Sequence, residues 1–203
     1  MTDETRPYRK KRRAEAEAET RRRITESAVE LHGTVGPSRT SMSAIAERAG
    51  VRRSTLYRHF PDESAVFAAC SQHWMAENPA PDPGPWERIG DPDERLREAL
   101  GELYPYYRRC EGMFANLHRD EATVPAVRRT FGGGFRTYQA AVLELLMQGR
   151  RTRGRRRSVV QAAVGHAIAF TTWRSLAREQ GLGDSEATEL MCGLVAAAAS
   201  PGG

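Results

Sequence analysis

Residues 40–60 constrain the fold of this chain more than any other stretch, because they read as two short helices joined by a glycine turn. Ser41 is placed to cap the first helix, and Ile45 and Ala49 belong to its apolar side. Gly50 lies where the chain must reverse, since glycine adopts the left-handed conformation without a Cβ penalty. The stretch therefore predicts a helix-turn-helix.

The second helix of this pair separates an apolar side from a polar one. Val51 fills the turn, and Leu56 and Phe60, four residues apart, point inward. The outward residues are hydrogen-bond donors with no acid among them: Arg52, Arg53, Ser54, Thr55, Tyr57, Arg58 and His59. Such a face suits a phosphate-lined groove, and the alternative is an ordinary helical pair with a basic, solvated surface.

The two runs Ile45-Ala-Glu-Arg-Ala-Gly-Val and Thr55-Leu-Tyr-Arg-His-Phe resemble the DNA-binding domain of TetR-family transcriptional regulators. The resemblance covers roughly residues 20 to 70. It implies that the second helix enters a major groove, and that the first helix of the domain supports the pair. Glu63 departs from the family pattern, which often has a lysine there that approaches a phosphate.

The resemblance and the outward face together define the expected DNA contacts. Tyr57 and His59 match family positions that hold phosphates, and the residues from Arg52 to Thr55 are candidates for reading base edges. The start of the preceding helix is expected to flank the same groove. The full expected set is Ser41, Met42, Ser43, Arg52, Arg53, Ser54, Thr55, Tyr57, Arg58 and His59.

Positive charge is concentrated in the part of the chain that carries the helix pair. Residues 1–60 hold 14 Lys and Arg against 8 Asp and Glu, whereas residues 61–203 hold 17 against 18. This asymmetry is typical of a nucleic-acid binder joined to a neutral second domain. Three distant cysteines and the lack of a membrane-length apolar run or an apolar signal core indicate a cytoplasmic protein.

Composition divides the chain into four parts. Residues 1–12 are polar and aperiodic and predict a disordered basic arm, either a solvated tail or an arm that reaches phosphates or a minor groove. Residues 13–77 predict the helix-turn-helix domain, and the proline-rich residues 78–91 a linker. Residues 92–200 predict a helical ligand-binding and dimerisation domain.

Only helical patterns follow the linker, so the predicted fold class is all-α: a three-helix N-terminal domain and a helical C-terminal domain. The expected helices are 92–109, 111–119, 124–148, 157–180 and 184–199. The Gly132-Gly-Gly run is expected to weaken or break the third of these, because glycine is a poor helix former.

The last two helices carry long stripes of apolar and small residues that a single small chain cannot bury on both sides. In the family such helices pair with those of a second subunit, as a two-fold four-helix bundle allows. A purely intramolecular core is the alternative. The expected dimer interface comprises Val160, Val164, Ala167, Ile168, Thr171, Leu190, Leu194, Val195 and Ala198.

Aromatic residues of the C-terminal part suit either an ordinary core or the apolar ligand pocket that the family resemblance implies. The candidates for a pocket are Tyr104, Tyr107, Phe114, Phe135, Tyr138, Gln139, His166, Phe170 and Trp173. No catalytic or metal-binding spacing is present, and the pair Cys70 and His73 offers too few ligands for zinc. We therefore expect no enzyme activity, no metal and no cofactor.

The sequence thus favours a ligand-responsive, homodimeric transcriptional regulator, a repressor by resemblance, whose partners are a palindromic operator duplex and a small-molecule effector. The alternatives are a sequence-tolerant architectural DNA-binding protein, a helical scaffold and a small-molecule-binding enzyme. One feature stands outside this assignment. Residues 150–157 contain six arginines and form either a flexible, solvated connector or an anion-binding or second nucleic-acid contact.

Overall fold

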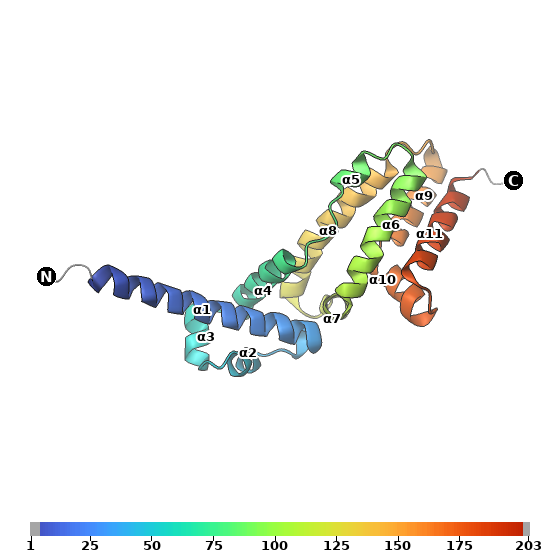
Figure 1. Ribbon diagram of the computed structural model, residues 1–203. Coiled ribbons are helices and arrows are strands. Elements are labelled where there is room, and N and C mark those ends of the chain that lie inside the picture. Colours follow the sequence, from blue (N-terminus) through green and yellow to red (C-terminus); the bar gives the residue numbers. More distant parts are fainter. Residues whose placement is uncertain (1–4, 201–203) are drawn as a thin grey trace. The chain divides into compact units, whose positions relative to one another are not determined.

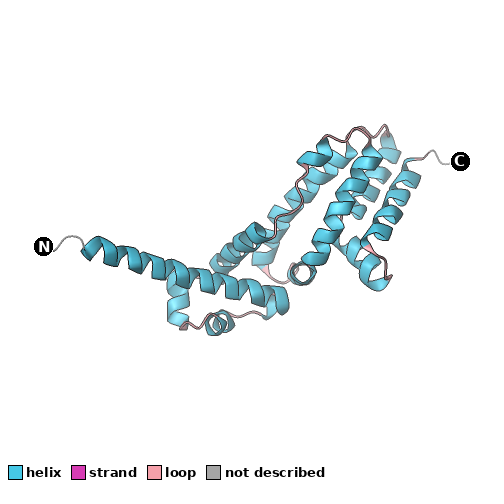
Figure 2. Ribbon diagram, viewed as in Figure 1, coloured by secondary structure: helices cyan, strands magenta, loops and turns pink. Residues whose placement is uncertain are grey.

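The computed structural model describes residues 5–200. Every regular element in this range is helical (Figure 2), so the predicted all-α fold class is confirmed. The chain divides into two compact units (Figure 1). Unit 1 runs to Asn78 and includes Ala115–Gly132, and unit 2 comprises Pro79–Phe114 and the chain from Gly133 onward.

Unit 1 is built on a long first helix, α1 (Thr5–Thr34), which is followed by a 3₁₀ turn and three further helices. Their bounds are η1 Pro37–Arg39, α2 Met42–Arg48, α3 Arg53–His59 and α4 Glu63–Glu77. The side chains predicted to point inward from the helix pair are buried, and so are apolar side chains of α1 and α4. The buried set includes Ile45, Leu56 and Phe60 of the pair and Ile24, Ala28, Val66, Phe67 and Cys70 of α1 and α4. Helix α1 packs on both α4 and α2, and α2 packs on α3, so α1 supports the helix-turn-helix pair.

The expected disordered arm is helical in its described part. Residues 1–4 lie outside the described range, but α1 already begins at Thr5. Ion pairs one helical turn apart join Lys11 to Glu15 and Arg13 to Glu17. Such (i, i+4) pairs each stabilise a helix slightly, and the alternating Ala and Glu residues are good helix formers. The polar composition therefore reflects an exposed helix.

Two further helices contribute to both units: α7 (Glu111–Asp120) and α8 (Pro125–Met147). Residues 115–132, which were predicted to belong to the C-terminal domain, cluster with unit 1 instead. Helix α8 continues through Gly132–Gly134, so the glycine run does not break it. A Cβ atom at Gly133 or Gly134 would meet nothing within 4 Å, so these two glycines are not required for close packing.

Unit 2 is a helical bundle whose members are shown in Figure 1. Its helices are α5 Gly84–Glu87, α6 Pro92–Arg109, α9 Gly154–Ala167, α10 Phe170–Arg174, the π-helical segment η2 Ser175–Glu179 and α11 Asp184–Ala199. Helix α11 packs on both α6 and α9. The predicted linker is part of this unit, because Trp86 is fully buried and its Nε1 donates to Glu102 at 3.0 Å.

The single helix predicted over 157–180 is interrupted after Ala167. The hydroxyl of Tyr104 donates to the carbonyl of Ala167 at 2.9 Å, and that of Tyr107 donates to the carbonyl of Ile168 at 2.6 Å. These two hydrogen bonds satisfy carbonyls that a continuous helix would have used. The break therefore depends on side chains about sixty residues away, which local periodicity could not reveal. By contrast, the bounds of α6 and α11 agree with the predicted 92–109 and 184–199.

Candidate nucleic-acid interface

The turn between α2 and α3 has the hydrogen bonds of a Schellman motif. The amide of Gly50 donates to the carbonyl of Glu47 at 3.0 Å, and that of Val51 donates to the carbonyl of Ala46 at 2.9 Å. Gly50 has a φ of 62°, in the left-handed region that favours glycine. At the other end of α2, the Ser41 hydroxyl accepts from the amide of Ala44 at 3.1 Å. The predicted cap and turn are thus both present.

Helix α3 presents a basic face with no acidic residue on the helix. Arg53, Ser54, Tyr57 and Arg58 are exposed, and so is Arg52 at the N-cap. The guanidinium of Arg53 lies 5.8 Å from the centroid of the Tyr57 ring, one helical turn away. This cation–π contact groups the two side chains on the exposed surface while both keep their donors available. The face can offer guanidinium and hydroxyl donors to phosphates and base edges.

Not every expected contact residue lies on this face. Met42 is only 5% exposed and belongs to the core, and it lines the same small cavity as His32 of α1 and Phe67 of α4. The hydroxyl of Ser41 is occupied as the helix cap, whereas Ser43 is exposed and Thr55 is half-buried. Met42 is therefore withdrawn from the set of expected contacts.

His59, at the end of α3, is partly enclosed. Its Nε2 atom is shielded from solvent and has no hydrogen-bond partner among residues 5–200. Burial, together with the positive charges of Arg58 and Arg21, holds the pKa of His59 below its ordinary value. In the free protein, the lowered pKa favours the neutral imidazole.

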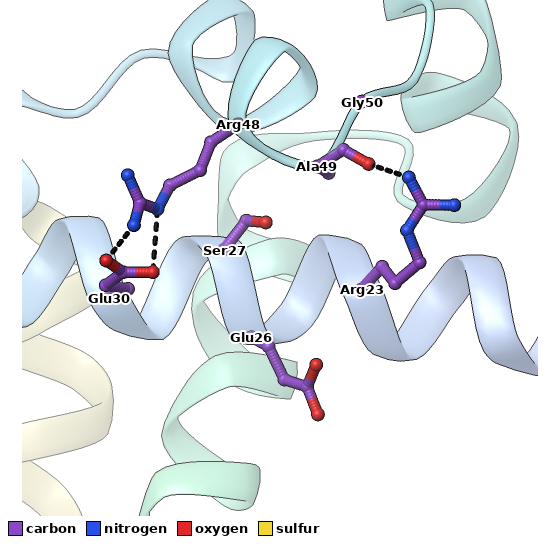
Figure 3. Close-up of a pocket in the computed structure, with 7 residues that line it drawn as sticks. All are labelled: Arg23, Glu26, Ser27, Glu30, Arg48, Ala49 and Gly50. Carbon is purple, nitrogen blue, oxygen red and sulfur yellow. Dashed lines mark hydrogen bonds and ion pairs between the residues drawn. The ribbon is translucent and has the colours of Figure 1, made fainter.

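Arginines of α1 brace the helix pair, a role that the sequence pattern did not reveal. Arg21 donates to the carbonyl of His59 at 2.7 Å and lies 4.1 Å above the ring of Phe60. Arg23 donates to the carbonyl of Ala49, next to the turn (Figure 3). These donors satisfy carbonyls at the C-terminal ends of α3 and α2, where cations also interact favourably with the helix dipole.

Figure 3 shows a shallow hollow between α1 and the turn at the end of α2. Arg48 pairs there with Glu30, with Nε and Oε2 2.8 Å apart, and Glu26 lines the same hollow. Two guanidiniums and two carboxylates line the hollow, so it offers no net positive surface to an anion. The contacts of Arg23 with Ala49 and of Arg48 with Glu30 join α2 to α1.

The C-terminal end of α1 is capped by residues of α7, about 84 positions later. Asn116 Nδ2 donates to the carbonyls of His32 and Gly33 at 3.0 and 2.9 Å. Arg119 donates to the carbonyl of Val35 at 2.9 Å, and the carboxylate of Asp120 accepts from the amide of Ser38 at 2.9 Å. We call Asn116, Arg119 and Asp120 the α7 latch. It fixes the segment that leads from α1 into α2.

Cys70 lies in the core of unit 1 and contacts His32, with Sγ and Nδ1 3.3 Å apart, rather than pairing with His73. Burial raises the pKa of the Cys70 thiol to about 12 and lowers the pKa of His32 to about 4, against a smaller opposing effect of the Asp120 charge on His32. Both groups are therefore neutral at pH 7. No three His, Cys, Asp or Glu side chains within residues 5–200 are grouped closely enough to hold a metal ion.

Unit 2 brings most of the expected pocket residues together. Phe114 packs against Tyr107, Phe135 and Phe170 with ring centroids 5.6, 4.8 and 5.2 Å apart. Trp173 and Tyr104 are fully buried beside this cluster, while Phe135, Tyr138 and Gln139 of α8 are half-buried. His166 is exposed and shares hydrogen bonds with Thr172, so it lies apart from the aromatic cluster.

The expected dimer-interface residues divide into two groups. Val160, Val164, Ala167, Ile168 and Val195 are buried in the core of unit 2, so they are unavailable to a second subunit. Leu190 and Leu194 are 43% and 52% exposed. Thr171 is exposed on α10, and Ala198 is half-buried. The most apolar stripe of each helix therefore faces its own core, while Leu190 and Leu194 remain on the exposed side of α11.

Several apolar or small residues of α9 and α11 remain exposed, and with His166 we call them the exposed stripe. It consists of Val159, Ala162 and His166 on α9, with Leu190, Gly193, Leu194 and Ala197 on α11. The α11 positions follow the i, i+3, i+4, i+7 spacing of one helix face. A Cβ atom at Gly193 would meet nothing within 4 Å in this chain, so the stripe is open along its centre.

Among residues 5–200, no helix combines the length and the apolar character that a membrane crossing requires.

Residues 24–70, which contain α2, α3 and most of α4, match the family model of the bacterial regulatory proteins of the tetR family. A segment of 50 residues is 44% identical to the HTH-type transcriptional regulator AcrR of Shigella flexneri. That match covers 25% of this chain and 23% of the length of the relative.

Two solved structures resemble the chain over most of its length. A putative fatty acid metabolism regulator of Clostridium perfringens has a TM-score of 0.60 at 16% identity, covering 85% of this chain and 96% of that one. A transcriptional regulator of a Rhodococcus species has a TM-score of 0.59 at 20% identity, covering 86% and 95%. At these identities the similarity establishes the shared fold.

Proposed function

We propose that this chain, which belongs to the TetR family of bacterial regulatory proteins through its residues 24–70, is a dimeric, ligand-responsive transcriptional repressor. The observation that carries the proposal is the exposed face of α3, with four basic or hydroxyl-bearing side chains and no acid. Arg52 at its N-cap extends the same face. Such a face fits the donor and acceptor pattern of a major groove lined by phosphates.

Within this proposal the side chains have different tasks. Arg52 and Arg53 read base edges, because a guanidinium donates two hydrogen bonds to O6 and N7 of guanine. Tyr57 and Arg58 bind phosphates that fix the position of α3 on the duplex. The exposed residue Ser43 at the start of α2 lies where it can contact the flanking backbone. Glu63 opens α4 with a negative charge, so phosphate binding there falls to backbone amides.

The dimer forms through the exposed stripe of α9 and α11. Val159, Leu190 and Leu194 are three of the large apolar side chains that residues 5–200 leave exposed. Pairing this stripe with that of a second copy about a two-fold axis buries it in a four-helix bundle. The symmetry then requires a pseudo-palindromic operator with half-sites on the order of 34 Å apart.

The effector binds in unit 2 beside the half-buried residues of α8. Phe135 and Tyr138 offer ring surface, and Gln139 offers an amide that donates to the carbonyl of Ile168 at 3.4 Å, a long hydrogen bond. An apolar or aromatic effector with one acceptor group matches this lining. If the effector favours the conformation that does not fit the operator, linkage requires that the operator weaken effector binding by the same factor.

Footprinting of the purified protein on the DNA that flanks its own gene tests the proposal. The expected result is one protected, pseudo-palindromic site that survives an excess of unrelated duplex. A uniform retardation of all duplexes would instead indicate a sequence-tolerant architectural protein. No retardation at all would indicate a scaffold, and either outcome would overturn the proposal.

A further inference from the structure

The turn that joins α8 to α9 carries a concentrated positive surface. Five arginines of this turn and of the first turn of α9 are exposed, and we call them the arginine platform: Arg151, Arg153, Arg155, Arg156 and Arg157. All five belong to unit 2, whereas the helix-turn-helix belongs to unit 1. The face of α3 therefore does not account for this surface.

The base of the platform is anchored, which argues against a flexible connector. Arg150 is 9% exposed and donates to Asp93 Oδ1 and to the carbonyl of Pro92, both at 2.7 Å. Arg95, also buried, donates to the carbonyls of Leu145 and Gln148 at 3.1 and 2.9 Å. The two buried guanidiniums thus tie the end of α8 and the start of the turn to α6. The backbone at the base of the platform is thus anchored before any partner binds, which reduces the backbone entropy lost on binding.

Within the described part of the chain, the platform arginines lack the carboxylate partners that three other exposed arginines of unit 2 have. Arg97 pairs with Glu189 at 2.9 Å, Arg108 with Asp184 at 2.7 Å, and Arg178 with Glu111 at 2.6 Å. No ion pair joins a platform arginine to a carboxylate within residues 5–200. The carboxylates at the base of the turn are already engaged, since Asp91 caps α6 and Asp93 holds Arg150.

The position of the platform adds to its positive potential. Arg155, Arg156 and Arg157 lie in the first turn of α9, where the helix dipole is positive and no acidic residue is present. Cations are disfavoured at the N-terminal end of a helix, because they are repelled by the positive end of the helix dipole. The three guanidiniums also repel one another. A bound polyanion would relieve both repulsions at once.

We propose that the arginine platform binds the phosphate backbone of duplex DNA, independently of α3 and without regard to base sequence. Arginine guanidiniums bind phosphates in a bidentate manner, and duplex DNA carries a dense, regular array of them. Residues 149–158 contain no aromatic side chain that could stack on unpaired bases and no apolar side chain that could enter a bilayer. They also lack the aromatic anchors of most protein interfaces. The platform gives the protein a second nucleic-acid contact, which lets one molecule hold two duplex segments.

Fluorescence anisotropy with the full-length protein tests this binding. The probe is a labelled duplex of about 24 base pairs with a scrambled sequence. The background variant is Arg52→Ala/Arg53→Ala, which disables the contact of α3 proposed above. In this background we expect residual, salt-dependent binding. Adding Arg→Gln changes at all five platform positions lowers the affinity at least ~10-fold at roughly 50 mM salt and flattens the log–log salt slope by about 2 to 4.

A matched pair of double variants separates the platform from general charge. Arg155→Gln/Arg156→Gln and Arg109→Gln/Arg174→Gln each remove two exposed positive charges from unit 2. The proposal predicts a clear loss of duplex affinity for the first and less than a ~2-fold change for the second, with both proteins showing wild-type circular dichroism. Equal losses, or an unchanged affinity and salt slope in the five-position variant, would overturn the proposal.

Two further probes test whether duplex DNA is the partner. Polyglutamate of equal charge and vesicles containing an anionic lipid are titrated against the background variant. If the platform-dependent binding of both polyglutamate and the vesicles is weaker than that of the duplex, duplex DNA is supported as the partner. Tighter binding to polyglutamate would assign the surface to an acidic protein, and tighter binding to vesicles to a membrane, and either result would overturn the proposal. Loss of specific operator binding alone would concern α3 and leave this surface unaffected.

Discussion

The carboxylate of Asp120 accepts a hydrogen bond from the backbone amide of Ser38 at 2.9 Å, although the two residues are 82 positions apart in the chain. Asp120 is only 2% exposed and also pairs with Arg119 at 2.8 Å. This relationship ties α7 to the segment that enters the helix-turn-helix. The placement of α2 within unit 1 therefore depends on a residue outside residues 24–70.

Replacement of Asp120 by alanine should destabilise unit 1 in a pH-dependent way. Burial acts to raise the pKa of Asp120, but hydrogen bonds from Arg119 and Ser38 outweigh it and hold the pKa below its ordinary value. The stabilisation is thus fully present above a pH of about 3.9 and is lost as the pH falls through the folded-state pKa. At pH 7 we expect the free energy of unfolding, measured with urea, to fall by about 1–3 kcal/mol. If the difference in free energy of unfolding between Asp120→Ala and the wild type stays constant down to the lowest accessible pH, this account is contradicted.

Gly36 should tolerate no side chain, because it lies under the α7 latch with a φ of 93°. A Cβ atom there would lie 2.7 Å from Asp120 Oδ2 and would also collide with the guanidinium of Arg119. We expect Gly36→Ala to lower the free energy of unfolding by about 1–3 kcal/mol, which thermal unfolding would show as a lower midpoint temperature. Gly101→Ala is the matched control, since Gly101 lies within α6 and its Cβ would meet nothing within 4 Å. That change should stabilise by up to about 1 kcal/mol, and a loss of similar size in both variants would rule out the latch as the cause.

His32 should make unit 1 less stable as the pH falls. Burial lowers the pKa of His32 to about 4, whereas the unfolded chain takes up the proton near its ordinary value of about 6.5. The unfolded state therefore binds one more proton between these values, and folding loses roughly 3 kcal/mol across that window. Urea unfolding of His32→Gln at several pH values should show a shallower decline between about pH 6.5 and 4. An identical decline in the variant would mean that another group is responsible.

Charge introduced on the exposed stripe of α11 should separate the proposed dimer. Leu190→Glu/Leu194→Glu places four carboxylates at a two-fold interface that is otherwise apolar, so the subunits should dissociate. Sedimentation equilibrium at micromolar concentration should find a monomer with wild-type circular dichroism. The control is Met75→Glu in unit 1, a side chain that is 50% exposed, and this variant should remain dimeric. A folded Leu190→Glu/Leu194→Glu dimer would place the interface elsewhere.

Much of the helical arrangement could be predicted from local sequence, because caps and turns act over a few residues. Ser41 and Gly50 mark the two ends of α2 as predicted, and each acts through neighbouring backbone groups. Asp62 caps the start of α4 in the same local way. The break after Ala167 could not be predicted, since it depends on the hydroxyls of Tyr104 and Tyr107. Met42 was assigned to the groove because its position in the chain does not reveal that it packs on the core.

Local sequence was also insufficient to predict which residues form the dimer interface and which arginines are free to bind DNA. Periodicity identifies the more apolar stripe of a helix, and in α9 and α11 that stripe is the core of unit 2 rather than the exposed surface. Arg21 and Arg23 belong to residues 1–60, whose excess positive charge indicated nucleic-acid binding, yet they donate to backbone carbonyls 38 and 26 positions away, respectively. Only three-dimensional contacts distinguish an arginine that braces the fold from one that is free to bind a phosphate.

The central claim is that the protein reads duplex DNA through α3, and a quantitative footprint titration comparing wild type with Arg53→Ala tests it most directly. Arg53 is exposed and forms no ion pair with a carboxylate among residues 5–200. Arg109, which is exposed on unit 2, supplies the matched control Arg109→Ala. We predict a pseudo-palindromic protected site flanking the gene, an affinity for that site lowered by about 1–3 kcal/mol, or roughly 5- to 150-fold, in Arg53→Ala, and an unchanged affinity in the control. Wild-type affinity of Arg53→Ala for the protected site would contradict the account.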